Sequence, residues 1–148
     1  MTLDQYYLEL LRNISSRSDD PDTQVGCILV GRNSEIRSTG CNRFPKGVRI
    51  TTERLTRPAK YTFMEHAERN AIFNAARNGI PLDGCISYQS WYSCSECARA
   101  LIQSGIVEVV IDGSEDNPWR TRTDSKWAED IELGKQMLSE SGVAVRMA

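Results

Sequence analysis

The chain has 148 residues, 40% of them hydrophobic and 26% charged, with a formal net charge of -2. This length and composition are typical of one globular domain, here residues 1–148, that buries a core without disulfide bonds. The slightly negative charge argues against a general nucleic-acid-binding protein. The sequence has neither a long apolar run nor a basic start followed by an apolar stretch. We therefore expect a cytoplasmic protein with no membrane span and no signal peptide.

The first part of the chain predicts a helix followed by a pair of strands. Apolar residues spaced three and four apart predict an amphipathic helix over residues 3–14. A short apolar run over 25–30, a turn at 31–34 and a second run over 35–41 predict an antiparallel hairpin. Residues 43–60 contain glycine, prolines and many charges without a clear period, so we expect an irregular loop.

The second part of the chain alternates between helix and strand patterns. We expect, in order, a helix over 65–77, a strand over 85–90, a helix over 95–104, a strand over 106–111, a polar stretch over 112–125, a helix over 126–140 and a strand over 143–147. Strand–helix–strand repetition predicts parallel pairing in this part, attached to the antiparallel hairpin. The sequence therefore predicts an α/β fold, a three-layer α/β/α sandwich around a mixed five-stranded sheet.

Three residues with metal-binding side chains form the most informative pattern in the sequence. His66 is the only histidine, and Cys94 and Cys97 form a Cys-x-x-Cys pair after it. One imidazole and two thiolates are one ligand short of a closed structural zinc site, whereas catalytic zinc sites keep one position open for water. His66 and Cys94 both fall where a predicted helix begins, and the exposed N–H groups there favour thiolates. We therefore predict a Zn²⁺ cofactor bound by His66, Cys94 and Cys97.

Glu68, two residues after His66, is the candidate catalytic residue. If the site is to turn over, Glu68 is better placed to carry a proton than to occupy the fourth metal position. A Cys-x-x-Cys pair alone also fits a redox dithiol or a structural zinc knuckle, and His-x-Glu alone is weaker evidence. Their combination is the signature of zinc-dependent base deaminases, in which a glutamate moves protons while ammonia leaves.

The chain resembles the cytidine and deoxycytidylate deaminase superfamily, and most of all its deoxycytidylate (dCMP) deaminases. The resemblance is carried by residues 20–27, 40–47, 66–72 and 97–102, and by Gly105-Ile106. The resemblance implies a cytidine deaminase-like fold and a zinc-ligand role for the histidine and the two cysteines. It also implies that Glu68 shuttles protons, that Asn42 contacts the sugar, and that the backbone amide of Ala67 holds the pyrimidine carbonyl.

Two departures from the family pattern bear on the substrate. Ser93 stands where the family has a proline; serine is a competent helix cap, so we expect the site to survive. Residues 40–43 lack the tyrosine and second glycine of a loop that binds nucleoside triphosphate effectors in regulated members. Residues 90–94 also resemble polynucleotide cytosine deaminases, and Asn42-Arg43 resembles the tRNA adenosine deaminase loop. Arg43, Ser90 and Trp91 are therefore further candidates for substrate binding.

A basic segment precedes the His66 helix. It contains six cations and one acid: Arg43, Lys46, Arg49, Arg54, Arg57 and Lys60 against Glu53. This excess of positive charge fits binding of a nucleotide phosphate. Two alternatives are a solvated loop without a ligand and a surface that binds a polynucleotide backbone. Two placements are open for the three tryptophans: the pocket, or ordinary packing in the core or an interface (Trp91, Trp119 and Trp127). The three remaining cysteines, on predicted strands, are expected to be small buried hydrophobic residues.

These observations predict a zinc-dependent hydrolase that deaminates a cytosine nucleotide, with dCMP converted to dUMP as the first candidate. The alternative is a deaminase of another nucleobase, nucleoside or polynucleotide, such as tRNA or single-stranded DNA. A non-catalytic zinc protein is the third hypothesis, and the presence of Glu68 argues against it. The family resemblance also implies a homo-oligomer, because members commonly complete their pockets with neighbouring subunits.

Overall fold

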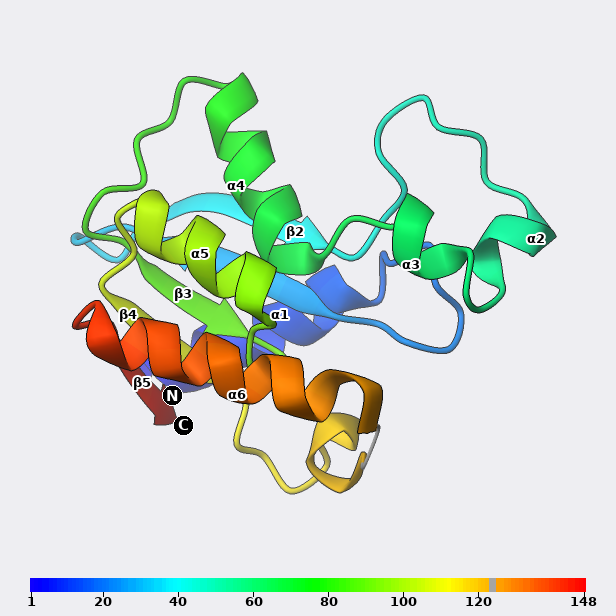
Figure 1. Cartoon of the computed structure of the whole chain (residues 1–148). Helices are drawn as coiled ribbons and strands as arrows, with labels where there is room; N and C mark the ends of the chain where they lie inside the picture. The colour runs from blue at the N-terminus through cyan, green and yellow to red at the C-terminus, as the bar shows by residue number, and fades with distance from the viewer. Residues whose placement is uncertain (123–124) are drawn as a thin grey trace.

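The computed structural model describes residues 1–122 and 125–148, and it contains one five-stranded sheet with helices on both faces (Figure 1). The strands are β1 (Gly26–Val30), β2 (Ile36–Cys41), β3 (Ile86–Gln89), β4 (Glu108–Ile111) and β5 (Ala144–Met147). The helices are α1 (Leu3–Ser15), α2 (Thr52–Leu55), α3 (Lys60–Phe63), α4 (Ala67–Arg77), α5 (Ser95–Gln103), the 3-10 helix η1 (Pro118–Thr121) and α6 (Ser125–Glu140).

The sheet is mixed, with the strand order β2-β1-β3-β4-β5. β1 is antiparallel to both β2 and β3, whereas β3, β4 and β5 are parallel. The sequence predicted both arrangements. A tight turn joins β1 to β2, as in an antiparallel hairpin, whereas helices join the strands of the parallel pairs. The predicted α/β fold with a mixed five-stranded sheet is therefore confirmed.

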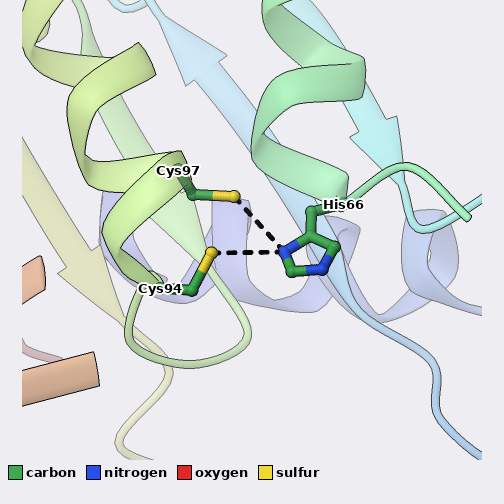
Figure 2. Close-up of side chains that lie close together, drawn as sticks. All are labelled: His66, Cys94 and Cys97. Carbon is green, nitrogen blue, oxygen red and sulfur yellow. Dashed lines mark hydrogen bonds between the residues drawn. The ribbon is translucent and has the colours of Figure 1, made fainter. Parts of the chain in front are cut away.

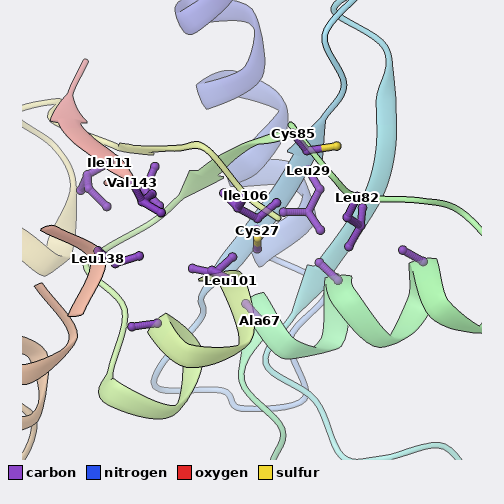
Figure 3. Close-up of a cluster of buried hydrophobic side chains, with 14 residues drawn as sticks. Cys27, Leu29, Ala67, Leu82, Cys85, Leu101, Ile106, Ile111, Leu138 and Val143 are labelled. Atoms are coloured by element: carbon purple, nitrogen blue, oxygen red, sulfur yellow. The ribbon is translucent and has the colours of Figure 1, made fainter. Parts of the chain in front are cut away.

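Each face of the sheet has its own apolar core. On one face α1 contributes Tyr7 and Leu11, which pack with Ile28 of β1 and Val110 of β4. On the other face α4, α5 and α6 cover a larger cluster (Figure 3). That cluster includes Cys27, Leu29, Ala71, Leu101, Val109 and Leu138. Because alternate strand residues point to opposite faces, neighbours such as Ile28 and Leu29 serve the two cores in turn.

The carboxyl ends of β2, β3 and β4 lie at one edge of the sheet. The pairing places Gly26 opposite Cys41, Cys27 opposite Gln89, and Gln89 opposite Ile111. α5 follows β3 directly, and α4 follows β2 after a long excursion, so both helices begin at this edge (Figure 1). In open α/β sheets ligands bind outside such strand ends.

The excursion between β2 and α4 is more ordered than the expected irregular loop over residues 43–60. It contains two helices of four residues each, α2 and α3, which are too short to show a helical period in the sequence. Arg43 and Glu65 close its base through two backbone hydrogen bonds of 3.1 and 2.8 Å. Because Glu65 takes part in this bridge, α4 begins at Ala67 rather than at the predicted residue 65.

The remaining predicted elements are present with small shifts of their ends. β4 begins at Glu108, two residues after the predicted strand start, and the predicted polar stretch 112–125 contains the 3-10 helix η1. Residues 123 and 124 of that stretch lie outside the described residues. Among the described residues, no helix combines the length and apolar character needed to span a bilayer. The organisation as one domain stays a prediction.

Candidate active site

The first turn of α4 carries His66 and Glu68. His66 occupies the N-cap position with extended backbone, and Glu68 lies in the first turn. Two features hold this helix end on the sheet. A Cβ on Gly40 would lie 2.4 Å from the carbonyl oxygen of Ala67, so only glycine permits this close approach. Asn70 then donates a hydrogen bond of 2.8 Å to the carbonyl oxygen of Cys41.

The first turn of α5 carries the two cysteines, with Cys94 at the N-cap position. The Cys94 side chain makes no cap hydrogen bond, and Asp130 of α6 supplies one instead. Its carboxylate accepts from the Ser95 amide at 3.0 Å and from the Ser95 hydroxyl at 2.6 Å. A Cβ on Gly134 would lie 2.5 Å from the Ser93 carbonyl oxygen, so glycine lets α6 pack closely on this loop.

His66, Cys94 and Cys97 converge on one point (Figure 2). The Nδ1 atom of His66 lies 3.4 Å from each sulfur atom, and the three ligand atoms lie within 4.8 Å of one another. Zinc–sulfur bonds of about 2.3 Å and zinc–nitrogen bonds of about 2.0–2.1 Å in tetrahedral geometry imply sulfur–nitrogen separations of roughly 3.6 Å. The donor set and its spacing therefore fit a zinc ion with one further position for a non-protein ligand.

The surroundings of the cluster favour the thiolate of Cys94 but disfavour that of Cys97. The hydrogen bond from Cys97, with a further contribution from His66, lowers the pKa of Cys94 to about 4. The same hydrogen bond and burial raise the pKa of Cys97. Arg69 lies 3.7 Å from the Cys97 sulfur, while its guanidinium also bonds Glu65 and Glu96. A divalent cation, together with this neighbouring guanidinium, would stabilise the second thiolate.

Glu68 is a buried carboxyl group beside the cluster, with 5% of its surface exposed. Burial raises the pKa of Glu68, although the neighbouring His66 opposes the shift. A buried carboxyl group with a raised pKa holds a proton more readily than an exposed one, so it can donate a proton as well as accept one. The arrangement can therefore support general acid–base chemistry beside the metal position.

A cavity of about 570 Å³ opens above the cluster. His66, Ala67, Glu68 and Cys94 line its floor. All three tryptophans of the chain line it as well, together with two tyrosines: Trp91, Trp119, Trp127, Tyr61 and Tyr92. Flat aromatic walls around a few polar groups are typical of sites that bind a planar ring.

The structure places three of the five predicted substrate-binding residues in this cavity: Asn42, Ala67 and Trp91. Ala67 is the first residue of α4, where a backbone N–H has no acceptor within the helix. Arg43 and Ser90 are not among the described residues that line the cavity. The guanidinium of Arg43 pairs instead with Asp19 at 3.4 Å.

Asn42 and Ser90 tie the cavity to the start of β1. The Asn42 side chain accepts from the Val25 amide at 2.9 Å and donates to the Thr23 carbonyl at 2.7 Å. The Ser90 hydroxyl accepts from the Gly26 amide at 2.9 Å. Both side chains therefore order the backbone that forms one side of the cavity.

Only two members of the basic segment, Arg57 and Lys60, line the cavity. Lys60 is nearly buried and forms an ion pair of 2.8 Å with the buried carboxylate of Asp20. Arg122 and Lys135 are cavity cations that sequence reasoning did not identify. They lie far from the two motifs in the chain, and no local pattern distinguished them from surface residues.

Aromatic side chains of α3 and α6 complete the wall beside the metal ligands. The Trp127 ring meets the His66 ring edge-on at 5.4 Å between centroids, and meets Tyr61 at 5.8 Å. The sequence left open whether Trp119 and Trp127 face the pocket or pack elsewhere. The structure places both in the cavity.

The fold is a mixed sheet with helices on both faces, and the starts of α4 and α5 bring together a His/Cys/Cys cluster and a buried glutamate. This combination is that of a zinc-dependent hydrolase. The sequence profile described as the cytidine and deoxycytidylate deaminase zinc-binding region matches residues 1–112. The chain belongs to this family of zinc-dependent deaminases, as its sequence motifs predicted. Zinc is the cofactor that the family and the three-ligand cluster define.

Relatives of known sequence and structure agree with this assignment. The chain is 35% identical over 140 residues to the uncharacterized deaminase in the luxG 3' region of Aliivibrio fischeri, covering 94% of this chain and 88% of that protein. It is 35% identical over 113 residues to deoxycytidylate deaminase of Homo sapiens, covering 72% of this chain. The match spans 62% of the human protein, less than two thirds of its length.

A solved structure shares the whole fold. The dCMP deaminase of cyanophage S-TIM5, in complex with dCMP and dUMP, has a TM-score of 0.75 and 25% sequence identity. The similarity covers 100% of this chain and 99% of that chain.

Proposed function

We propose that the chain converts dCMP to dUMP and ammonia. The observation that carries the proposal is the buried Glu68 beside the His66, Cys94 and Cys97 cluster, at the floor of an aromatic cavity. Relatives named deoxycytidylate deaminase and the S-TIM5 complex with dCMP and dUMP support this substrate.

The residues of the floor would bind and orient the cytosine ring. The backbone N–H of Ala67, at the start of α4, would donate a hydrogen bond to the pyrimidine carbonyl oxygen. Trp91 and Trp127 would pack against the ring and exclude water from it. Asn42, which already orders the Thr23–Val25 backbone, would contact the sugar with its remaining hydrogen-bonding capacity.

The reaction adds water to C4 of the cytosine ring and breaks the bond between C4 and the exocyclic amine. When bound by the three ligands, zinc would supply the Lewis acidity that lowers the pKa of water enough to make it a nucleophile at neutral pH. Glu68 would take one proton from the attacking water and pass it to the ring nitrogen, and would then take the proton of the new hydroxyl on C4 and pass it to the amine as ammonia leaves. Its buried position limits competing exchange with bulk solvent. The products are then dUMP and ammonia.

The decisive experiment is a substrate panel with the zinc-loaded protein. Ammonia release would be followed with dCMP, dCTP, deoxycytidine, cytosine and a single-stranded oligonucleotide that contains cytosine. We expect the highest kcat/KM with dCMP. Turnover confined to deoxycytidine or cytosine would show that the phosphate is not recognised. Salt-sensitive turnover confined to the oligonucleotide would favour the polynucleotide alternative.

A homo-oligomer remains part of the proposal, supported by the family resemblance alone. Light scattering of the zinc-loaded protein during gel filtration measures its mass. A species with the mass of one chain, active on dCMP, would contradict this expectation.

A further inference from the structure

The segment between β4 and α6 is anchored beside the cavity by Asn117. This residue is buried, with 5% of its surface exposed. Its side-chain amide donates to the carbonyl oxygens of Ser90 at 2.9 Å and Asp112 at 2.6 Å, while its oxygen accepts from the Trp119 amide at 3.0 Å. Three hydrogen bonds from one buried amide therefore fix the start of η1 on the carboxyl end of β3.

This anchored segment carries Arg122 to the cavity. The guanidinium of Arg122 lies 4.7 Å from the centre of the Trp119 ring. It also donates to the Thr23 hydroxyl at 3.2 Å and to the Asp22 carbonyl at 3.5 Å. The stacked ring and two oxygen acceptors hold a charged group at the cavity although it remains exposed to solvent. Arg122 thus joins two parts of the chain separated by 99 residues.

The partners of Arg122 are uncharged, in contrast to those of the two cavity lysines. Lys60 pairs with the Asp20 carboxylate at 2.8 Å, and Lys135 pairs with the Glu132 carboxylate at 2.9 Å. Within residues 1–122 and 125–148, no carboxylate forms an ion pair with Arg122. Its charge is therefore not compensated by an acidic side chain in this part of the chain. A planar guanidinium is also the cation best suited to bind a phosphate through two parallel hydrogen bonds.

Arg122 also lies where a phosphate is expected if the base, sugar and phosphate of a nucleotide follow one another along the cavity. The metal ligands and Glu68 lie at the floor, where the base reacts. Asn42, the candidate sugar contact, donates to the carbonyl oxygen of Thr23, and Arg122 donates to the hydroxyl of the same threonine. Thr23 therefore links the sugar position to the guanidinium.

We infer that Arg122 recognises the 5'-phosphate of the substrate and gives the enzyme its preference for a nucleotide over a nucleoside. The inference rests on the proposed function and assigns the phosphate contact to a residue outside the basic segment 43–60. Arg57, a cavity cation of that segment, is the competing candidate. Its guanidinium lies 5.9 Å from the centre of the Tyr61 ring.

The test compares kcat/KM for dCMP and for deoxycytidine in zinc-loaded wild type, Arg122→Gln, Arg122→Lys and Arg57→Gln. Loss of a charge-assisted contact predicts a fall of about 10- to 100-fold for dCMP in Arg122→Gln. We expect deoxycytidine turnover to stay within about twofold of wild type, because a nucleoside makes no such contact. Arg122→Lys keeps the charge without the paired donors, so its kcat/KM for dCMP should lie between those of wild type and Arg122→Gln. The inhibition constant of inorganic phosphate should rise in Arg122→Gln alone.

Each outcome separates the inference from the proposed function. Arg99→Gln, an exposed substitution on α5, serves as the matched control and should match wild type. If wild type deaminates dCMP but Arg122→Gln loses nothing, or loses dCMP and deoxycytidine activity equally, the assignment to Arg122 is wrong and the function stands. A selective loss in Arg57→Gln instead would also overturn it. If wild type does not deaminate dCMP, the proposed function itself fails.

Discussion

The floor of the cavity is carried by the first turns of α4 and α5, whereas its wall comes from segments far apart in the chain. On the floor, His66, Glu68 and Cys94 lie at helix starts that Gly40 and Gly134 allow to pack closely against their neighbours. Such positions are fixed by regular backbone and by buried contacts. Reacting groups need this rigidity because small misplacements reduce the rate strongly.

The wall is built from connections and from one face of α6. Tyr61 comes from α3, Trp91 follows β3, Trp119 lies in η1, and Trp127 and Lys135 lie in α6. The Trp127 ring contacts the rings of Tyr61 and His66 edge-on, and the Lys135 ammonium lies 4.1 Å from the centre of the Tyr92 ring. We therefore expect substitutions on the floor to change the rate of the reaction, and substitutions in the wall to change affinity and the choice of substrate.

The largest expected effect is that of Glu68→Gln on the floor. Glutamine keeps the size of the side chain but cannot accept the proton, so kcat should fall by about 10²- to 10⁴-fold. Because Glu68 is not a metal ligand in this proposal, zinc content should stay at the wild-type level. Steady-state kinetics and elemental analysis of the purified variant measure both.

The matched control for this prediction is Glu129→Gln, an exposed substitution on α6 that does not line the cavity. Its kcat and KM should equal those of wild type. A Glu68→Gln variant that binds zinc fully and keeps wild-type activity would show that Glu68 is not catalytic, and the functional distinction between floor and wall would be wrong.

The next effect concerns stability and tests the ion pair between α3 and the loop before β1. Lys60→Met leaves the Asp20 carboxylate buried without its cation, and breaking a buried pair in this way costs about 3–5 kcal/mol. Burial alone would raise the pKa of Asp20, but hydrogen bonds from Lys60, Asp22 and Thr23 lower it overall. Chemical denaturation at pH 7 measures the loss, with the exposed Lys46→Met as control.

The pH dependence of this ion pair has a definite sign. Since the folded-state pKa of Asp20 is lowered, its stabilising contribution is complete above the usual aspartate range and is lost as the pH falls through the lowered pKa. The difference in stability between wild type and Lys60→Met should therefore shrink in acid. A constant difference between pH 7 and pH 2 would contradict the role assigned to the pair.

The floor was predictable from the sequence because its chemistry is local. His66 and Glu68 are two residues apart, Cys94 and Cys97 are three apart, and the helical periods after them indicate where each helix begins. Strand alternation and short connections likewise sufficed to predict the mixed sheet. These features depend on neighbours in the chain, which a sequence displays directly.

The wall was not predictable to the same degree, because its residues meet only through tertiary packing. Nothing near Arg122 in the sequence relates it to Thr23, which lies 99 residues earlier. The excess of cations over 43–60 pointed to the phosphate. In the structure Lys60 is neutralised by Asp20, and Arg43 turns to Asp19. A local count of charge does not reveal which charges are already paired.

A smaller effect is expected when the wall is changed where it meets the floor. Trp127→Leu removes the edge-on contacts with His66 and Tyr61. An aromatic pair of this kind contributes little beyond burial, so KM for dCMP should rise about 3- to 10-fold while kcat changes less. Trp127→Phe keeps a ring and should fall closer to wild type. A fall in kcat as large as that of Glu68→Gln would show that Trp127 belongs functionally to the floor.

The smallest effect on the active site is expected for Ser93, which stands where the family has a proline, because this residue acts mainly on stability. Its hydroxyl donates to the Gln89 side chain at 2.8 Å, Gln89 donates to Ser87 at 2.8 Å, and Ser87 contacts the Cys27 sulfur at 3.4 Å. All four residues are buried. Ser93→Ala leaves the Gln89 oxygen without this donor, at a cost of about 1–2 kcal/mol.

Pairing Ser93→Ala with Gln89→Met distinguishes a polar network from a simple packing effect. If the hydroxyl acts through Gln89, the cost of Ser93→Ala should largely disappear once residue 89 is apolar, a coupling of about 1 kcal/mol. Additive losses would show that Ser93 stabilises the loop independently of the chain of hydrogen bonds. Losing a direct partner of a metal ligand typically lowers metal affinity about 10- to 100-fold. The Ser93 hydroxyl bonds Gln89 and not a metal ligand, so zinc affinity, measured by competition with a chelator, should change by less than about tenfold. The network would then account for how this chain holds Cys94 in place without the proline of its relatives.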